Sequence, residues 1–283
     1  MNIIEIIKTI ILGIVEGITE WLPVSSTGHM ILVNEFIGNK GFTSDDLFLY
    51  VIQLGAILAV VTLYFNKLNP FSPEKTSEEK KDTWQMWFKV VVACLPAAVI
   101  GLLLNDFMEN FENWIVVSST LIIYGIAFLF IENKSKQTNI STINQLSYKT
   151  ALIIGAFQVL SIIPGTSRSG STILGAMLIG CSRAVAAEFS FFLAIPVMFG
   201  VSFLKIASYL KDVYIDMILA PIPTSDWILL VIGMVVAYAV SLAAIKFLMG
   251  YVKNHDFKAF GKYRIVLGLI VILYFSLKLF IYA

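Results

Sequence analysis

The stretch from Glu16 to Met30, EGITEWLPVSSTGHM, carries ionisable and helix-breaking residues inside an apolar run that begins at Ile3. Ionisable side chains at membrane depth are costly and usually mark a functional site. Pro23 and Gly28 interrupt the helix, and backbone groups freed in this way must be satisfied by protein or by a wet cavity. We therefore expect a helical hairpin that enters the membrane and turns back, with its polar tip buried in protein.

The composition of the chain indicates a membrane location. Of its 283 residues, 58% are hydrophobic and 14% are charged, which is typical of a polytopic membrane protein rather than a soluble domain. The formal net charge of +1 gives no overall electrostatic reason to bind nucleic acid. Cys94 and Cys181 form no CxxC or zinc-binding pattern, so we expect free thiols.

The apolar segments predict an all-α polytopic membrane protein. Besides the first hairpin, at residues 3–37, the sequence predicts a second helical hairpin at residues 149–180. Further segments are long enough to cross a bilayer, which takes about 20 apolar residues in a helix. These predicted spans lie at residues 46–66, 84–104, 113–132, 185–207, 226–248 and 262–281.

An internal repeat is predicted to relate the two halves of the chain, residues 1–142 and 143–283. A shift of 142 residues carries GIVEGITEWLPVSSTGHMIL onto GAFQVLSIIPGTSRSGSTIL, so that Ser25 matches Ser167. Each half would contain one hairpin and three spans, which gives the halves opposite orientations, as in the inverted repeats of many transporters. The two tips would then enter from opposite faces and meet near the midplane.

Lysine and arginine are unevenly distributed between the two predicted sides, and the richer side is expected to be cytoplasmic. The richer side would carry Lys67, Lys75, Lys80, Lys81, Lys134, Lys136, Lys149, Arg183, Lys253, Lys258, Lys262 and Arg264. The other side would carry Lys8, Lys40 and Lys211. Both termini and the mouth of the first hairpin are therefore predicted to face outward, together with Gly41 and Asp106.

The second tip, PGTSRSGST at Pro164–Thr172, has the composition of an anion site. Arg168 is the only arginine outside the predicted cytoplasmic margins, and its guanidinium is a permanently charged, planar fork that suits phosphate oxygens. Ser167, Ser169 and the amides that begin the following helix would add donors and the positive end of a helix dipole. The alternative is a structural arginine paired with a carboxylate of the other tip, and both roles can coexist.

The first tip supplies candidates for acid–base chemistry. Glu16 and Glu20 lie four residues apart on one helix face, where two carboxylates can hold a hard divalent cation or act as base and orienter. His29 follows across the turn, where the hairpin can bring it to Glu20, and is a candidate base, acid or nucleophile. Ser25 and Ser26 can bind phosphate oxygens, and one of them can be a nucleophile activated by His29. The alternatives are hydrogen-bonded structural acids, a hydrogen-bonded histidine and loop-capping serines.

Together these groups predict a membrane-embedded site for an anionic, phosphorylated ligand that is reached from the lipid. Hydrolysis is favoured over a secondary transporter or a flippase for an anionic lipid, because a carrier gains nothing from two carboxylates beside an arginine. Repeats and re-entrant tips taken alone would suit alternating access, so transport stays an alternative. An anion channel is a weaker alternative.

The two tip sequences, EGITEWLPVSSTGHM with its E-x-x-x-E spacing and PGTSRSGST, resemble the signature motifs of the BacA-type undecaprenyl-diphosphate phosphatases, the bacitracin resistance family. The likeness extends over the whole length of the chain. It implies an integral enzyme of the bacterial plasma membrane that hydrolyses undecaprenyl diphosphate to undecaprenyl phosphate and inorganic phosphate. Such an enzyme recycles the carrier lipid of cell-wall peptidoglycan synthesis and confers resistance to the antibiotic bacitracin.

The site expected from the motifs and the resemblance combines both tips. Its catalytic residues would be Glu16, Glu20, Ser26, His29 and Arg168, and its phosphate-binding residues would be Ser25, Ser26, Ser167, Arg168 and Ser169. Because a diphosphate and two carboxylates repel each other, we expect Mg²⁺ or Ca²⁺ at Glu16 and Glu20. The expected partners are the polyprenyl diphosphate lipid and the bilayer, without nucleic acid. A homodimer is left open, and the site is expected to open to the outer face.

Overall fold

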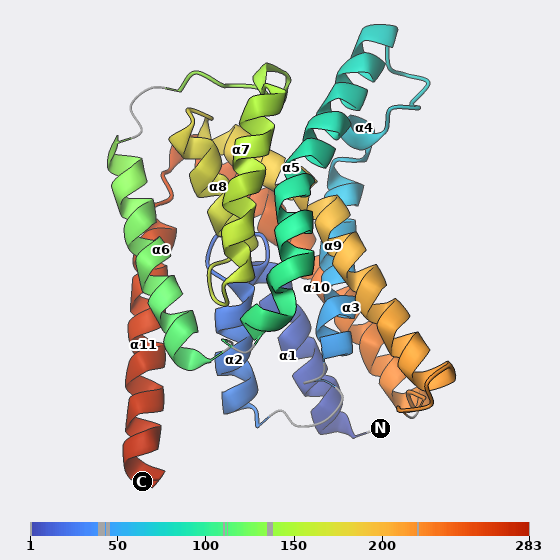
Figure 1. Cartoon of the computed structure of the whole chain (residues 1–283), viewed down its shortest axis with the longest axis vertical. Helices are drawn as coiled ribbons and strands as arrows, with labels where there is room; N and C mark the ends of the chain where they lie inside the picture. Colours follow the sequence, from blue (N-terminus) through green and yellow to red (C-terminus); the bar gives the residue numbers. More distant parts are fainter. Residues whose placement is uncertain are drawn as a thin grey trace.

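The computed structural model describes residues 2–38, 43, 46–109, 111, 113–134, 138–219 and 221–282, and the regular structure of this part is helical (Figure 1). The helices are, in chain order, α1 Ile3–Thr19, α2 Ser26–Phe36, α3 Asp46–Leu63, α4 Phe65–Leu68, α5 Ser77–Glu109, α6 Trp114–Lys134, η2 Ile143–Gln145, α7 Tyr148–Val159, η3 Leu160–Ile162, α8 Arg168–Leu178, α9 Arg183–Tyr214, α10 Thr224–Asn254 and α11 Lys258–Tyr282.

Within the described part of the chain, α5, α6, α9, α10 and α11 are long and apolar enough to cross a membrane. The predicted all-α polytopic membrane fold is therefore confirmed. The remaining predicted span, residues 46–66, corresponds to a shorter apolar helix, because α3 ends at Leu63 and the single turn α4 follows. The 18 residues of α3 rise by about 1.5 Å each and cover roughly 27 Å, close to the thickness of the hydrocarbon core.

Helix α5 begins earlier than the predicted span at residues 84–104. Thr76 and Glu79 form a reciprocal cap in front of it: the amide of Glu79 donates to Thr76 Oγ1 over 3.2 Å, and the amide of Thr76 donates to the Glu79 carboxylate over 2.7 Å. The charged residues from Ser77 to Thr83 therefore belong to α5.

The two short hairpins lie at opposite ends of the molecule. In Figure 1, α1 rises from the N-terminus at the bottom and α2 returns downward, whereas α7 descends from the top and α8 returns upward. Hydrogen bonds between the first tip, near Glu20, and the second tip, near Arg168, place the two turns against each other. The hairpins thus bring the two most polar stretches of the apolar sequence together inside the bundle.

Ser25 and Ser167 have the same unusual backbone conformation at the two tips. Their φ and ψ angles are 75° and 102° for Ser25 and 73° and 119° for Ser167. Each serine caps the helix that follows it, accepting a hydrogen bond from the amide of Gly28 or Gly170 over 3.3 Å and 3.1 Å. A positive φ is strained for a residue with a side chain and persists where surrounding structure enforces it. The shared geometry at matched positions supports the predicted repeat.

The two hairpins pack in equivalent ways against long helices of the opposite half. Helix α1 packs against α10 so closely that a methyl group on Gly17 would lie 2.8 Å from the carbonyl oxygen of Ala237. Helix α7 packs as closely against α5, where a methyl group on Gly155 would lie 2.1 Å from the carbonyl oxygen of Ala93. Small residues allow such approach between membrane helices. Each hairpin therefore rests on a long helix of the other half, which is consistent with an inverted repeat.

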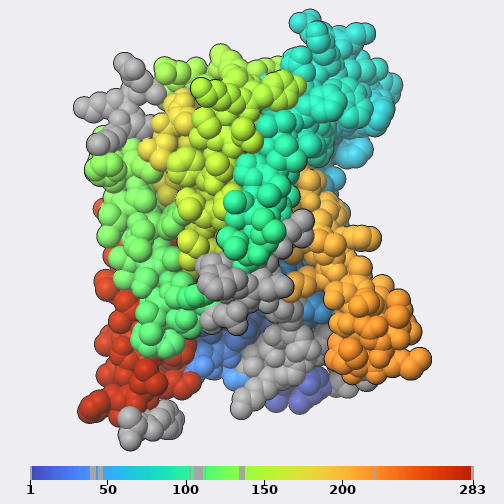
Figure 2. All heavy atoms as spheres, viewed as in Figure 1, coloured from blue at the N-terminus to red at the C-terminus, as the bar shows by residue number. Residues whose placement is uncertain are grey.

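On the face of the molecule seen in Figure 2, α6, α7 and α5 lie across the upper part, with α11 at the lower left and α9 at the lower right. Large apolar side chains are exposed along these helices, among them Val91 on α5, Ile123 and Phe130 on α6, and Leu152 on α7. An exposed apolar surface that extends along several long helices matches a lipid environment.

Candidate active site

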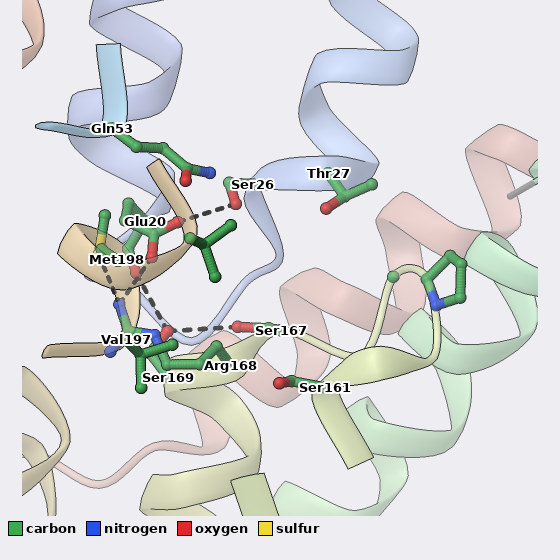
Figure 3. A pocket seen from close by; sticks show the side chains of 13 residues that line it. Glu20, Ser26, Thr27, Gln53, Ser161, Ser167, Arg168, Ser169, Val197 and Met198 are labelled. Atoms are coloured by element: carbon green, nitrogen blue, oxygen red, sulfur yellow. Dashed lines mark hydrogen bonds and ion pairs between the residues drawn. The ribbon is translucent and has the colours of Figure 1, made fainter. Parts of the chain in front are cut away.

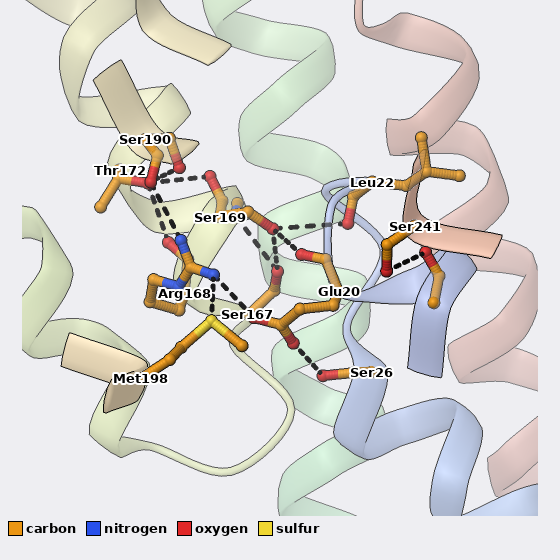
Figure 4. A network of polar contacts seen from close by, with 12 residues as sticks. Glu20, Leu22, Ser26, Ser167, Arg168, Ser169, Thr172, Ser190, Met198 and Ser241 are labelled. Atoms are coloured by element: carbon orange, nitrogen blue, oxygen red, sulfur yellow. Dashed lines mark hydrogen bonds and ion pairs between the residues drawn. The ribbon is translucent and has the colours of Figure 1, made fainter. Parts of the chain in front are cut away.

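Glu20 and Arg168 form an ion pair that joins the two tips (Figure 4). Arg168 Nη2 lies 2.7 Å from Glu20 Oε1, and the side chains are 11% and 9% exposed. Glu20 is the C-terminal cap of α1, and Arg168 is the first residue of α8. The pairing considered as the alternative role for Arg168 is therefore present. The position of Arg168 at a helix N-terminus also leaves an anion-binding role open.

Ser26, the first residue of α2, shares the carboxylate of Glu20. Its hydroxyl donates to Glu20 Oε2 over 3.0 Å, so that one carboxylate oxygen binds the Arg168 guanidinium and the other binds the Ser26 hydroxyl. A serine hydroxyl directed at a carboxylate is oriented to give up its proton as its oxygen attacks an electrophile. The three side chains thus form one connected group with contributions from both tips.

The irregular backbone of the first tip is satisfied by the second tip. Ser169 Oγ lies within hydrogen-bond distance of the carbonyl oxygens of Glu20 and Leu22, at 3.1 Å and 3.4 Å.

Arg168 Nη1 donates to the carbonyl oxygen of Ser190 in α9 over 3.0 Å, and the Arg168 guanidinium lies 5.8 Å from the centre of the Trp21 ring. These contacts fix Arg168 from three sides. They also confirm that the polar tip of the first hairpin is buried in protein, as the sequence predicted.

A cavity of about 220 Å³ opens beside this group (Figure 3). Its polar lining comes from both tips and from α3 and includes Glu20, Ser26, Gln53, Ser161, Ser167 and Arg168. The N-termini of α2 and α8 both begin at this cavity, since Ser26 and Arg168 are their first residues. Two helix N-termini and a guanidinium give the cavity the electrostatic character of a phosphate site. The sequence analysis did not predict Gln53 and Ser161 as site residues. Gln53 could have been found, because it is a lone amide side chain within the apolar sequence of α3.

Glu16 lies one helical turn before Glu20 and is 2% exposed. Its Oε1 atom is buried without a hydrogen-bond partner among the described residues. An unpartnered buried carboxylate oxygen is costly unless a proton or a cation completes it. In the described part of the chain no three His, Cys, Asp or Glu side chains are grouped as metal ligands. The free oxygen of Glu16 fits a cation, but both oxygens of Glu20 are bonded to Arg168 and Ser26. A cation shared by the two carboxylates would therefore replace one partner of Glu20 and take its other ligands from phosphate oxygens or water.

His29 contacts α11 instead of Glu20. Its Nδ1 lies 2.7 Å from the carbonyl oxygen of Ser25 and its Nε2 lies 2.7 Å from the hydroxyl of Tyr263, on which the ring is stacked. The expected meeting of His29 with Glu20 was wrong, because both ring nitrogens are bonded elsewhere: Nδ1 to the carbonyl oxygen of Ser25 and Nε2 to the hydroxyl of Tyr263 on α11. A carbonyl oxygen only accepts, so Nδ1 carries a proton, and neutral His29 accepts from Tyr263 at Nε2.

Arg264 is a second polar residue whose surroundings the sequence predicted wrongly. It was expected at the cytoplasmic margin, but its side chain is fully buried against both tips. Its guanidinium donates to the carbonyl oxygen of Pro23 in the first tip over 3.2 Å, and to those of Gly165 and Thr166 in the second over 3.1 Å and 2.9 Å. Helix α11 begins at Lys258, so Arg264 lies more than one turn inside it. These carbonyl groups of the two tips, which the sequence does not reveal as partners, stabilise the buried charge.

Comparison with known proteins agrees with the geometry of the two tips. The family model described as bacitracin resistance protein BacA matches residues 9–270. The chain belongs to the BacA family. The resemblance inferred from the two tip motifs is thereby confirmed.

The similar BacA-family proteins carry the name undecaprenyl-diphosphatase. One from Acetivibrio thermocellus is 59% identical over 277 residues, which cover 96% of this chain and 98% of the relative. One from Enterococcus faecalis is 58% identical over 273 residues, which cover 94% of this chain and 96% of the relative. One from Streptococcus thermophilus is 54% identical over 283 residues, which cover 98% of this chain and 96% of the relative.

Proposed function

We propose that this BacA-family chain hydrolyses undecaprenyl diphosphate to undecaprenyl phosphate and inorganic phosphate within the membrane. The observation that carries the proposal is the group formed by Glu20, Ser26 and Arg168 in one cavity built from both tips. Glu20 is the proton acceptor of this group, Ser26 supplies the nucleophilic oxygen, and Arg168 is the cation that binds phosphate oxygens. The names of the similar proteins supply the substrate.

In the proposed first step, Ser26 Oγ attacks the terminal phosphorus while its proton passes to Glu20 Oε2, 3.0 Å away. The bond from phosphorus to the bridging oxygen breaks, and its electron pair leaves with undecaprenyl phosphate. Water then replaces the serine at phosphorus. The proton on Glu20 returns to Ser26 Oγ, the hydrogens of the water leave with inorganic phosphate, and the site is restored.

Arg168 stabilises charge in both steps. Its guanidinium lines the cavity and carries a fixed positive charge, bound to the same carboxylate that accepts from Ser26. The backbone amides at the starts of α2 and α8 add partial positive charge on the same side. Ser167 and Ser169 are the remaining hydroxyls of the second tip at the cavity and serve as phosphate ligands. Ser25, predicted to bind phosphate, caps α2 through its side-chain oxygen and does not line the cavity, so we assign it no contact with phosphate.

We also propose that Mg²⁺ or Ca²⁺ takes part, held by Glu16 and Glu20. The unpartnered oxygen of Glu16 supports this proposal. A bound divalent cation would remove the repulsion between the carboxylates and the diphosphate. It would also stabilise the negative charge on the departing phosphate. In this arrangement Glu20 would keep its bond to Ser26 through Oε2, and Oε1, which binds Arg168 here, would turn to the cation.

The apolar chain of the substrate lies in a membrane, and the multi-pass fold places the protein in one as well. We propose the bacterial plasma membrane, with the lysine-rich end in the cytoplasm and the mouth of the first hairpin at the outer face. The charge distribution supports this orientation.

The direct experiment is phosphate release from undecaprenyl diphosphate by purified protein in detergent. Detergent micelles hold no gradient and no second compartment, so a transporter or flippase would give no signal there. Release that depends on Ser26 would support the proposal. An intact, folded sample that binds the lipid but releases no phosphate would refute it.

A further inference from the structure

Arg264 is an unusual buried charge, because its partners are carbonyl oxygens rather than a carboxylate. Its side chain is fully buried, and in the described part of the chain no ion pair is formed with it. The guanidinium binds one carbonyl of the first tip and two of the second, and it lies 5.5 Å from the centre of the Tyr124 ring. A buried guanidinium without a counterion is expensive, so it persists only where several oriented dipoles replace water.

The bound carbonyls lie just before the strained serines of the two tips. Pro23 precedes Ser25 by two residues, and Thr166 immediately precedes Ser167. These serines have φ angles of 75° and 73°. Such conformations need an external constraint, and Arg264 supplies one to both tips from a single helix.

The two strained serines are followed at once by the reacting groups. Ser26 comes directly after Ser25, and Arg168 comes directly after Ser167. A shift of either tip carbonyl would therefore move the hydroxyl of Ser26 or the guanidinium of Arg168 relative to a bound phosphate. Arg264 itself does not line the cavity that holds Ser26 and Arg168. Its influence on a ligand there must pass through the backbone of the tips.

We propose that Arg264 is a positioning residue for hydrolysis, which holds both tips in register so that Ser26 and Arg168 act on the same phosphorus. This inference rests on the proposed function. Lysine cannot replace it, because one ammonium group lacks the planar fork that reaches carbonyls of two separate loops. Because Arg264 does not line the cavity, loss of its side chain should lower kcat and leave KM nearly unchanged.

The test compares wild type with Arg264→Lys and Arg264→Met in the phosphate-release assay, with thermal unfolding in detergent measured on each sample. Lys262→Met is the matched control, since Lys262 is an exposed cation on the same helix. We expect kcat to fall about a hundredfold in both Arg264 variants, the loss typical of misplacement by roughly 1 Å, with KM within a few-fold. The control should retain wild-type kinetics.

A chemical rescue separates positioning from general destabilisation. Guanidinium ion at millimolar concentration should raise the rate of Arg264→Ala at least several-fold, because it fits the space that the side chain leaves. The same addition should leave Lys262→Met unchanged. In the double variant Arg264→Met/Ser26→Ala, the rate should equal that of Ser26→Ala alone, because misalignment cannot harm a nucleophile that is absent.

Folded Arg264→Lys with wild-type kcat would overturn the inference. It would also be overturned if neither Arg264→Lys nor Arg264→Met folds, because Arg264 would then serve the fold as a whole. A wild type that releases no phosphate would instead refute the proposed function, and the inference with it. The three outcomes are distinguishable within one set of samples.

Discussion

Glu20 Oε1 and Arg168 Nη2 lie 2.7 Å apart although 148 residues separate them in the chain. This ion pair joins the end of α1 to the start of α8, and so joins the two halves at the cavity. A buried pair of this kind is weak support for stability, because the cost of desolvating both charges offsets their attraction. Because the same carboxylate also binds Ser26, we propose that the pair serves catalysis.

The first prediction follows from the shape of the Arg168 side chain. Arg168 binds Ser190 through Nη1 and Glu20 through Nη2, which a single ammonium group cannot reproduce. Arg168→Lys should therefore lower kcat/KM by roughly a hundredfold or more, nearly as much as Arg168→Ala. Steady-state phosphate release measures this, with Lys262→Arg as the control. Near-normal turnover of Arg168→Lys would argue against a role for the planar fork.

The second prediction concerns the divalent cation. Excess chelator should abolish phosphate release, and added Mg²⁺ or Ca²⁺ should restore it. Glu16→Gln should raise the metal concentration needed for half-maximal rate by about tenfold or more, since a ligand charge is lost. Full activity in excess chelator would rule out the cation and leave Glu16 and Glu20 as a pair that shares a proton.

The third prediction separates two roles of His29. If the imidazole holds the carbonyl of Ser25 through Nδ1, asparagine can place its amide nitrogen in the same position. His29→Asn should then keep most of the wild-type rate, while His29→Ala loses roughly a hundredfold through misplacement of Ser26. An equal, near-complete loss in both variants would favour acid–base catalysis by the imidazole.

The fourth prediction concerns orientation. Gly41 and the side chain of Asp106, both expected outside, fall beyond the described part of the structure, so we choose Lys211 near the end of α9 and Lys81 near the start of α5. These positions lie at opposite ends of the molecule (Figure 1). With Cys94→Ala and Cys181→Ala as background, a membrane-impermeant thiol reagent should label Lys211→Cys but not Lys81→Cys in intact cells. Labelling of position 81 alone would reverse the proposed orientation.

The sequence predicted the tips well because their signal is strong and local. Two carboxylates, a histidine and an arginine in apolar segments are expensive wherever they lie, so their presence alone marks a site. The match of Ser25 with Ser167 also predicted a shared feature, and both residues have the same strained backbone. The inverted repeat itself stays a prediction, supported by this geometry and by the crossed packing of α1 and α7.

The sequence could not predict contacts that depend on side-chain direction. Arg264 follows Lys258 and Lys262, so it was counted with the interfacial cations, yet its guanidinium points inward to three carbonyl groups. His29 was expected beside Glu20, but its imidazole is stacked on Tyr263. Spacing along a helix fixes which residues share a face. It does not show which neighbouring helix that face meets.

The central claim is that Ser26, oriented by Glu20, is the nucleophile of a membrane phosphatase. The most direct test is phosphate release from undecaprenyl diphosphate in detergent by wild type, Ser26→Ala and Ser25→Ala, with thermal unfolding recorded for each. Wild type should turn over, Ser26→Ala should lose at least about a thousandfold in kcat, and Ser25→Ala should lose less, since Ser25 caps a helix at a cost of about 1 kcal/mol. A folded Ser26→Ala within tenfold of the wild-type rate would contradict the claim.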